Sequence, residues 1–306
     1  MPGQILEESD SLMAGDDAVR PESDLLPESY APRPVPPPET AKGILRPREQ
    51  IRASNHSRLP AGEQVSRYVE FYWSVRWDRR GQPPYFAEVL GFPVVNMTFE
   101  HTHERRGGFV TGVWTTKYVR ELAGVGETFG VKFRPGGFGA FTGLDVGALR
   151  DTALPLTEVL PEAGDLAEQI LADPDDESRR TLVEAFLVEA AARRAVADDT
   201  AYRLVLRIMD AMESDRELTR VDQVTERFDT PIRTLQRLFR RYVGVSPKWV
   251  LRRFRLQDGA QLLAQGRTSD LAALALDLGY FDQAHFSREF AQEIGMAPLE
   301  YARLSL

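Results

Sequence analysis

The sequence predicts an α+β protein: a small N-terminal β-barrel or sandwich-like domain with helices at its end, followed by a C-terminal all-α domain of seven helices. Apolar and polar side chains alternate with a period of two from about residue 60 to 135, as in half-buried strands. After residue 158 the apolar side chains recur with a helical period. The length of 306 residues also exceeds that of a typical single domain.

The first 55 residues are rich in Pro, Glu, Asp and Ser, and include three consecutive prolines at 36–38. A segment with so few apolar side chains buries too little surface to offset the entropy lost on ordering. We therefore expect residues 1–55 to form a disordered tail, with the proline run in polyproline II conformation. A docking tail for a partner protein is the alternative interpretation.

Four short strands are predicted in the β-rich region. The first contains Val69, Phe71, Trp73, Val75 and Trp77 in alternation with polar neighbours, and three more cover 95–99, 109–113 and 129–133. Glycine-rich breaks separate them, as expected of an antiparallel sandwich or barrel. We expect Trp73, Trp77 and Trp114 to belong to the core of this domain rather than to a ligand cage.

Helical periodicity continues at 166–171 and 182–190, and the Asp198-Asp199-Thr200 run can cap the next helix. We place a domain boundary there. The predicted domains are therefore the tail at 1–55, the β-rich domain with its closing helices at 56–198, and the helical domain at 199–306.

Two helix pairs are predicted in the helical domain. The first pair covers 221–228 and 231–242, where Thr230 is the expected N-cap and Pro231 suits the first helical position. The second pair covers 271–278 and 283–290, with Gly279 in the turn and Asp282 as the cap. A long helix opened by Ser246-Pro247 joins the pairs. In each pair the second helix is polar on its outer side, which is the helix-turn-helix arrangement.

The basic charge of the chain is concentrated in the same region. The net charge is −8, but residues 203–306 hold 16 Lys and Arg against 14 Asp and Glu. Residues 233–255 contain eight basic side chains and no acidic one. They are Arg233, Arg237, Arg240, Arg241, Lys248, Arg252, Arg253 and Arg255. Such a stretch is typical of a nucleic-acid interface.

The segments LQRLFRRYVGVSP (235–247) and LGYFDQAHFSREFAQEIGMAP (278–298) closely resemble the AraC/XylS family of transcription regulators. The resemblance covers about 100 residues and implies two helix-turn-helix units that enter successive major-groove segments of double-stranded DNA. It places Arg233, Gln236 and Arg237 of the first unit near DNA, and Gln283, Ala284, His285, Ser287 and Arg288 of the second. Arg240, Arg252 and Arg253 are the further candidate DNA contacts, the last two expected on phosphates.

The first unit departs from the family pattern. A small alanine-containing step and a serine are common where this chain has Val224-Thr225 and Pro231. We therefore expect the first unit to grip DNA differently, while the second unit follows the pattern more closely.

The β-rich stretch from Tyr68 to Gly137 resembles the sensor-like domain that precedes such modules in actinobacterial regulators. The resemblance implies a cupin-like domain that binds a small-molecule effector or forms a homodimer. It does not identify the effector.

A rival function rests on His101 and His103, whose spacing places both imidazoles on one face of a strand. Cupin enzymes hold metal ions with such pairs, so a metal-dependent enzyme is one alternative. We favour a polar hairpin end, because no third and fourth ligand is identifiable, and we expect no cofactor and no enzymatic activity. A helical domain that binds proteins rather than DNA is the other alternative.

Composition excludes several classes of site. The chain has no cysteine, and therefore no disulfide, thiolate metal site or cysteine nucleophile. It also has no apolar run of 18 residues and no apolar core of a secretory signal near its start, so we expect a cytoplasmic protein without a membrane span.

Overall fold

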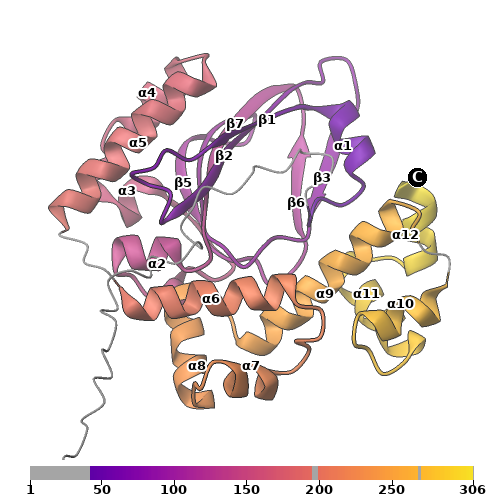
Figure 1. The fold of residues 1–306 in the computed structure, drawn as a ribbon. Helices are drawn as coiled ribbons and strands as arrows, with labels where there is room; N and C mark the ends of the chain where they lie inside the picture. The colour runs from indigo at the N-terminus through magenta and orange to yellow at the C-terminus, as the bar shows by residue number, and fades with distance from the viewer. Residues whose placement is uncertain (1–41, 195–198, 268–269, 306) are drawn as a thin grey trace, which may run out of the picture.

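The computed structural model describes residues 42–194, 199–267 and 270–305 (Figure 1). It confirms the predicted fold class, a β-sheet domain with helices followed by a helical domain. The predicted boundary at residue 198 lies within 195–198, outside the described residues.

Eight strands form two antiparallel sheets. The larger sheet has the strand order β1-β2-β7-β4-β5-β8, and β3 pairs with β6 in the smaller one. The strands are β1 (Asn55–Pro60), β2 (Val69–Asp78), β3 (Tyr85–Val89), β4 (Asn96–His101), β5 (Arg106–Thr111), β6 (Tyr118–Leu122), β7 (Val125–Phe133) and β8 (Ala153–Pro155). Figure 1 shows β3 and β6 standing apart from the larger sheet, which makes a two-layered arrangement.

The two faces of the larger sheet have different environments because side chains alternate along each strand. On one face, Tyr72, Phe99, Phe129 and Val131 are almost completely buried. They pack with the helices that follow the strands, α3 (Leu156–Val159), α4 (Leu166–Ala172) and α5 (Asp176–Arg193). The other face turns toward β3 and β6.

The helical domain contains the seven predicted helices within the described residues. They are α6 (Thr200–Ser214), α7 (Val221–Arg227), α8 (Ile232–Leu238), α9 (Pro247–Ala264), α10 (Leu271–Asp277), α11 (Gln283–Ile294) and α12 (Pro298–Ser305). Three predicted caps are present, since Asp199, Ser246 and Asp282 each accept a hydrogen bond from a backbone N–H of the following turn. No described helix is both long enough and apolar enough to cross a membrane.

The predicted disorder of residues 1–55 is wrong for residues 42–55, and residues 1–41 lie outside the described residues. Residues 47–53 form helix α1 (Pro47–Ala53), and Leu45 is 1% exposed. Leu45 packs with Leu90 and with the core of α9 to α12. Burial against distant elements supplies the stabilisation that the local composition lacks.

The helical domain packs tightly against the β domain. The core of the larger sheet continues into α2 (Gly137–Thr142) and α6, through Phe138 and Tyr202. The Tyr202 hydroxyl donates a hydrogen bond to the Arg67 carbonyl at 2.6 Å. At the other end, Lys117 donates to the Ile294 carbonyl at 2.9 Å. Helix α6 and the second helix pair are therefore both joined to the β domain.

Candidate nucleic-acid interface and a cavity in the β domain

Helix α8 is amphipathic in the way that the sequence predicts. Leu235 and Leu238 are buried, while Arg233, Gln236 and Arg237 are exposed. Within the described part of the chain, neither Arg233 nor Arg237 has an acidic partner. Their charges are therefore available to a ligand. Figure 1 shows α7 and α8 on the side of the molecule away from the strands, with α6 between them and the sheets.

The turn between α7 and α8 differs from the prediction. The N-cap position is Pro231, which has no side-chain cap, and the Thr230 hydroxyl instead donates to the Phe228 carbonyl at 2.9 Å. The left-handed residue of the turn is Asp229, with φ of 44°. A non-glycine residue in this conformation costs about 1 kcal/mol. The first unit, whose sequence differs from the family pattern at Val224-Thr225 and Pro231, therefore has a turn with its own geometry.

Arg240 lies beyond α8, in one turn of π-helix, Phe239–Val243. Its side chain is exposed, and its Nε lies 3.6 Å from a carboxylate oxygen of Asp145 in the β domain. Arg240 therefore borders both the predicted interface and the β domain, and its charge is partly matched by a neighbour.

The second unit follows the predicted pattern in detail. Gly279 has φ of 73°, and a Cβ there would lie 2.5 Å from Thr219 Cγ2. Asp282 accepts a hydrogen bond from the His285 N–H at 2.7 Å, which fixes the start of α11. Phe286 and Phe290 are completely buried beneath α11. The other side of this helix is therefore held outward.

The predicted contacts of the second unit lie on that outward side. Gln283, Ala284, His285 and Arg288 are exposed, and Ser287 is half-buried. Arg288 has no acidic partner among the described residues. His285 lies 3.9 Å from Glu289 across one helical turn. The outward surface is polar and basic, as a DNA contact requires.

Arg252 and Arg253 of α9, the predicted phosphate contacts, are paired within the protein, and Arg253 is also buried. Arg253 is 2% exposed, and its Nη2 donates to the Thr115 carbonyl at 2.7 Å. Burial lowers the pKa of Arg253 to about 10, so that it remains charged at neutral pH beside Glu293. Arg252 is half-buried and pairs with Glu289 and Glu293. Both side chains join α9 to its neighbours in the structure.

One exposed side chain at this surface was not singled out from the sequence. Phe281, directly before α11, is 87% exposed. The signal for its exposure in the sequence is its position in the tight turn that begins at the left-handed Gly279 and ends at Asp282, the N-cap of α11.

A cavity of about 510 Å³ lies between the two sheets. Alternate residues of three strands reach it from the larger sheet: Phe71, Trp73, Val75 and Trp77 of β2, Asn96, Thr98 and Glu100 of β4, and Thr128 and Lys132 of β7. Ala87 of β3 and Tyr118, Arg120 and Leu122 of β6 close the opposite side. This volume is typical of a small-molecule site.

Two of the three tryptophans differ from the prediction that they form core, and Trp77 confirms it. Trp77 is 4% exposed in a small cluster with Ala87 and Leu122, but Trp73 and Trp114 are half-buried, and all three line the cavity. The Trp73 indole lies over Gly130, where a Cβ would be 2.2 Å from Trp73 Cε2. A glycine at this point of β7 lets the indole lie along the sheet, so that the ring borders the cavity without filling it.

A buried charge network forms part of the cavity wall. Glu100 is 4% exposed and accepts hydrogen bonds from Arg105 and Thr98 at 2.8 Å and from Arg120 at 2.6 Å. Burial alone would raise the pKa of Glu100, but the hydrogen bonds and charges of the two arginines lower it overall. The carboxylate is therefore ionised and fully matched at neutral pH.

The cavity also reaches the helical domain. Glu213 of α6 and Gln261 of α9 line it. Nearby, the Gln257 amide of α9 donates to the Leu90 carbonyl at 2.7 Å, and Lys42 pairs with Asp258 at 2.7 Å. A molecule in the cavity would thus contact the helix that joins the two helix pairs.

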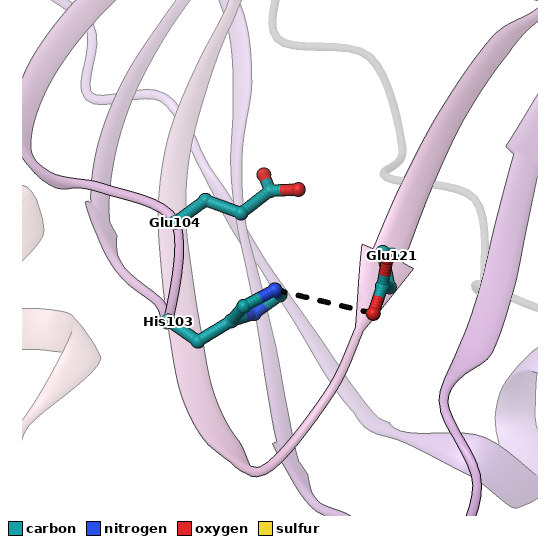
Figure 2. Close-up of side chains that lie close together, drawn as sticks. All are labelled: His103, Glu104 and Glu121. Carbon is teal, nitrogen blue, oxygen red and sulfur yellow. Dashed lines mark ion pairs between the residues drawn. The ribbon is translucent and has the colours of Figure 1, made fainter.

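His101 and His103 do not share a site. His101 ends β4, and residues 102–105 form the turn into β5, as the hairpin interpretation predicts. His103 instead lies near Glu104 and Glu121, with 4.0 Å between His103 Nε2 and a Glu121 oxygen (Figure 2). Among the residues that the structure describes, these three could hold a metal ion. Arg120 lies 3.4 Å from Glu104 and offsets its charge, which disfavours a cation there.

Two family models match the chain. Residues 224–304 match a helix-turn-helix domain, and residues 57–155 match a domain of unknown function (DUF6597). The C-terminal match confirms the helix-turn-helix domain that the two helix pairs predicted.

Similar proteins are regulators by name. An uncharacterized HTH-type transcriptional regulator of Haemophilus influenzae is 28% identical over 124 residues, 40% of each chain. The HTH-type transcriptional activator RhaS of Pectobacterium carotovorum is 33% identical over 75 residues, 24% of this chain and 26% of RhaS. The chain thus spans at most two fifths of these relatives' length. ToxT of Vibrio cholerae aligns over 82% of this chain and 98% of its own at 11% identity and a TM-score of 0.39, too distant for inference.

Proposed function

We propose that this chain, which carries an AraC-type helix-turn-helix domain over residues 224–304, is a sequence-specific DNA-binding transcription regulator. One observation carries the proposal: both α8 and α11 are held with a polar, basic side outward by buried apolar side chains beneath them. Two such helices on one rigid support are what recognition of two major-groove segments requires.

The outward side chains divide by chemistry. Arginine can bind guanine through two hydrogen bonds, and glutamine can bind adenine in the same way, so Arg237, Gln236, Gln283 and Arg288 are proposed base contacts. Four other side chains would contact phosphates or neighbouring bases and so fix the orientation of the helices: Arg233, Arg240, His285 and Ser287. Ala284 leaves room for a thymine methyl group. Arg252 and Arg253 are removed from the proposed interface because they are paired within the protein.

Helix α9 sets the scale of the DNA site. Its 18 residues give a length of about 27 Å at 1.5 Å per residue. One turn of B-DNA measures about 34 Å, a separation that a linker of this length and the turns at its two ends can span, and we propose that the two units contact neighbouring segments of one face of the duplex. The packing of both units against the β domain supports a fixed relative orientation.

We further propose that a small-molecule effector in the β-domain cavity controls DNA binding. The support is the position of Glu213 and Gln261, which belong to α6 and α9 and also line the cavity. A ligand that contacts these side chains in only one arrangement of α9 would shift the equilibrium toward that arrangement. Homodimer formation through the β domain stays a prediction, which sedimentation of the purified chain measures.

Two other functions are less well supported. A protein-binding helical domain gives no reason for unpaired arginines on both outward helices. A metal-dependent enzyme would need His101 and His103 in one ligand set, whereas the described group of potential ligands joins His103 to Glu104 and Glu121 without His101, and Arg120 offsets the charge of Glu104. The proposal therefore involves no catalytic step.

The salt dependence of DNA binding tests the proposal. The full chain is titrated with a pool of random duplexes at several salt concentrations. The proposal predicts a steep fall of log K with log salt, because phosphate contacts release counterions. The variant Arg303→Ala, which removes an exposed arginine of α12 away from the proposed interface, is the matched control and should behave as wild type. A flat line for the wild-type chain would refute DNA binding.

A further inference from the structure

The side chains that line the cavity between the two sheets indicate which class of molecule it would bind. We propose that the cavity binds a neutral, planar aromatic molecule that has both a hydrogen-bond donor and a hydrogen-bond acceptor. The inference rests on the proposed function in so far as this molecule would be the effector. Three properties of the wall carry it: flat aromatic faces, internally matched charges, and two buried polar atoms without partners.

The aromatic faces come from both layers. Phe71 and Trp73 contribute from the larger sheet, Tyr118 from β6 of the smaller sheet, and Phe92 and Trp114 from segments between strands. Arg58 and Lys132 lie over the Phe71 ring and Lys132 over the Phe92 ring, so the faces of these two rings are partly covered. Trp73 lies over Gly130 and Trp77 over Gly126, where a Cβ would come within 2.3 Å of the ring. Rings that lie along the sheet present flat surfaces, on which a planar ligand stacks most favourably.

The charged side chains of the wall are matched within the protein. Lys132 lies 3.0 Å from Glu70, Glu100 is bound by Arg105 and Arg120, and Lys42 pairs with Asp258. Arg58 and Glu213 also have interaction partners. An ionic ligand would therefore be buried without a counter-charge, which is costly.

The His56 imidazole agrees with a neutral ligand. His56 also lines the cavity, and burial lowers its pKa, so the ring is neutral at physiological pH. Its Nε2 lies 2.9 Å from the Ser54 hydroxyl, and the positive charge of Arg58 on the same strand also lowers the pKa. No positive histidine is therefore available to attract an anion.

Two polar atoms of the wall lack a partner among the described residues. Trp114 Nε1 is a buried donor, and Gln50 Oε1 is a buried acceptor on a side chain that is 6% exposed. An unsatisfied buried polar group costs about 1–3 kcal/mol, and each such group in a folded protein calls for an explanation. Both side chains line the cavity, although the two atoms themselves are covered in the structure. A ligand that accepts from Trp114 and donates to Gln50, after a rotation of these side chains toward the cavity, would satisfy both.

Isothermal titration calorimetry of the full chain tests the ligand class. The neutral probes are 2-quinolinone and acridone, which are planar and carry both N–H and C=O groups. The matched comparisons are quinoline-2-carboxylate, which is anionic, naphthalene, which has no polar atom, and glucose, which is not aromatic. We expect the neutral probes to bind at least about tenfold more tightly than each comparison compound. Tighter binding of the carboxylate or of glucose, or no binding of either neutral probe, would overturn the inference.

Two variants locate the binding. Trp114→Phe and Gln50→Leu should each weaken 2-quinolinone binding by about tenfold. Trp249→Phe, on α9 and outside the lining residues, is the control and should leave it unchanged. Equal binding by Trp114→Phe, Gln50→Leu and wild type would contradict the assigned site.

DNA binding is measured in parallel to separate the two proposals. A chain that binds DNA with steep salt dependence but none of the neutral probes would refute the ligand class and leave the regulator function standing. A chain that binds 2-quinolinone at Trp114 but no DNA would refute the regulator function and leave the ligand class standing. Because Trp114→Phe and Gln50→Leu lie away from α8 and α11, retained DNA affinity also shows that these variants are folded.

Discussion

The Arg253 guanidinium donates a hydrogen bond to the Thr115 carbonyl at 2.7 Å, across the junction between the two domains. The helix that joins the two helix-turn-helix units is thereby fastened to the segment that leads into β6. Arg255 of the same helix donates to the Gly279 carbonyl in the turn of the second unit, at 3.2 Å. Arginines that the sequence presents as a basic cluster therefore have two different tasks, structural on α9 and outward-facing on α8 and α11.

The first prediction separates these tasks. Arg253→Met should lower the free energy of unfolding by about 3 kcal/mol, because it removes a buried charge that is paired with Glu293 and bound to Thr115. It should leave the salt dependence of DNA binding unchanged. Denaturant unfolding and salt titration measure the two quantities. The contrast is Arg240→Met, an exposed arginine that should reduce the salt slope by about one without loss of stability. If Arg253→Met instead reduces the slope of log K against log salt, Arg253 contacts a DNA phosphate and the structural role is wrong.

The second prediction concerns base recognition. Arg237→Ala and Arg288→Ala should each weaken binding to a selected DNA site by about 1–3 kcal/mol and relax the preference at one position. Competition with single-base variants of the site measures both effects. Both side chains are exposed and unpaired among the described residues, so neither change should alter stability. Wild-type affinity in both variants would remove these arginines from the interface.

The third prediction concerns Glu100, whose pKa is below its usual value in the folded chain. Because the unfolded chain binds a proton at higher pH, the ionised carboxylate stabilises the fold above about pH 4.3, and this contribution is lost as the pH falls through the folded-state pKa. Glu100→Gln should therefore cost on the order of 3 kcal/mol at pH 7. The difference from wild type should shrink on acidification.

Urea unfolding at several pH values measures that difference. Glu104→Gln is the control, since Glu104 is exposed and lies 3.4 Å from Arg120. A difference that stays constant from pH 7 to pH 3 would show that Glu100 acts through packing rather than charge.

The fourth prediction tests the packing of the Trp73 indole against Gly130. Gly130→Ala should destabilise the fold by about 1–3 kcal/mol, because the added Cβ would lie 2.2 Å from the indole. The loss should be largely relieved in a Trp73→Leu background, where the ring is absent. Gly91→Ala, where a Cβ would meet no atom within 4 Å, is the matched control. Thermal unfolding of the four variants measures the coupling, and purely additive effects would contradict it.

The sequence is most informative where local chemistry decides the structure. Periodicity places the helices of the helical domain and four of the eight described strands, β2, β4, β5 and β7, but not β1, β3, β6 and β8. Asp199, Ser246 and Asp282 cap as expected because an N-cap needs only its own turn. The prediction of Thr230 as an N-cap is wrong. The Thr230 hydroxyl can either cap α8 or donate to the Phe228 carbonyl, and because both interactions are local, the sequence does not show which one forms. Local pattern therefore predicts elements better than it predicts the details of turns.

Long-range contacts account for the other differences. Leu45 is ordered by Leu90 and the core of α9 to α12, and Arg253 is buried by the β domain. Neither neighbour is adjacent in sequence. The cavity depends on glycines of β7 opposite tryptophans of β2, a cross-strand register that no single strand reveals. For the same reason Trp73 and Trp114 were expected in the core, whereas they border the cavity.

The measurement that tests the central claim most directly is selection of bound DNA from a randomised duplex pool by the purified full chain. Two recognition helices joined by α9 predict two conserved segments about 10–11 base pairs apart, centre to centre, on one face of the duplex. Selection repeated with Arg237→Ala should blur one segment, and with Arg288→Ala the other. Recovery of no enriched sequence, or of a single segment that both variants select unchanged, would contradict the account.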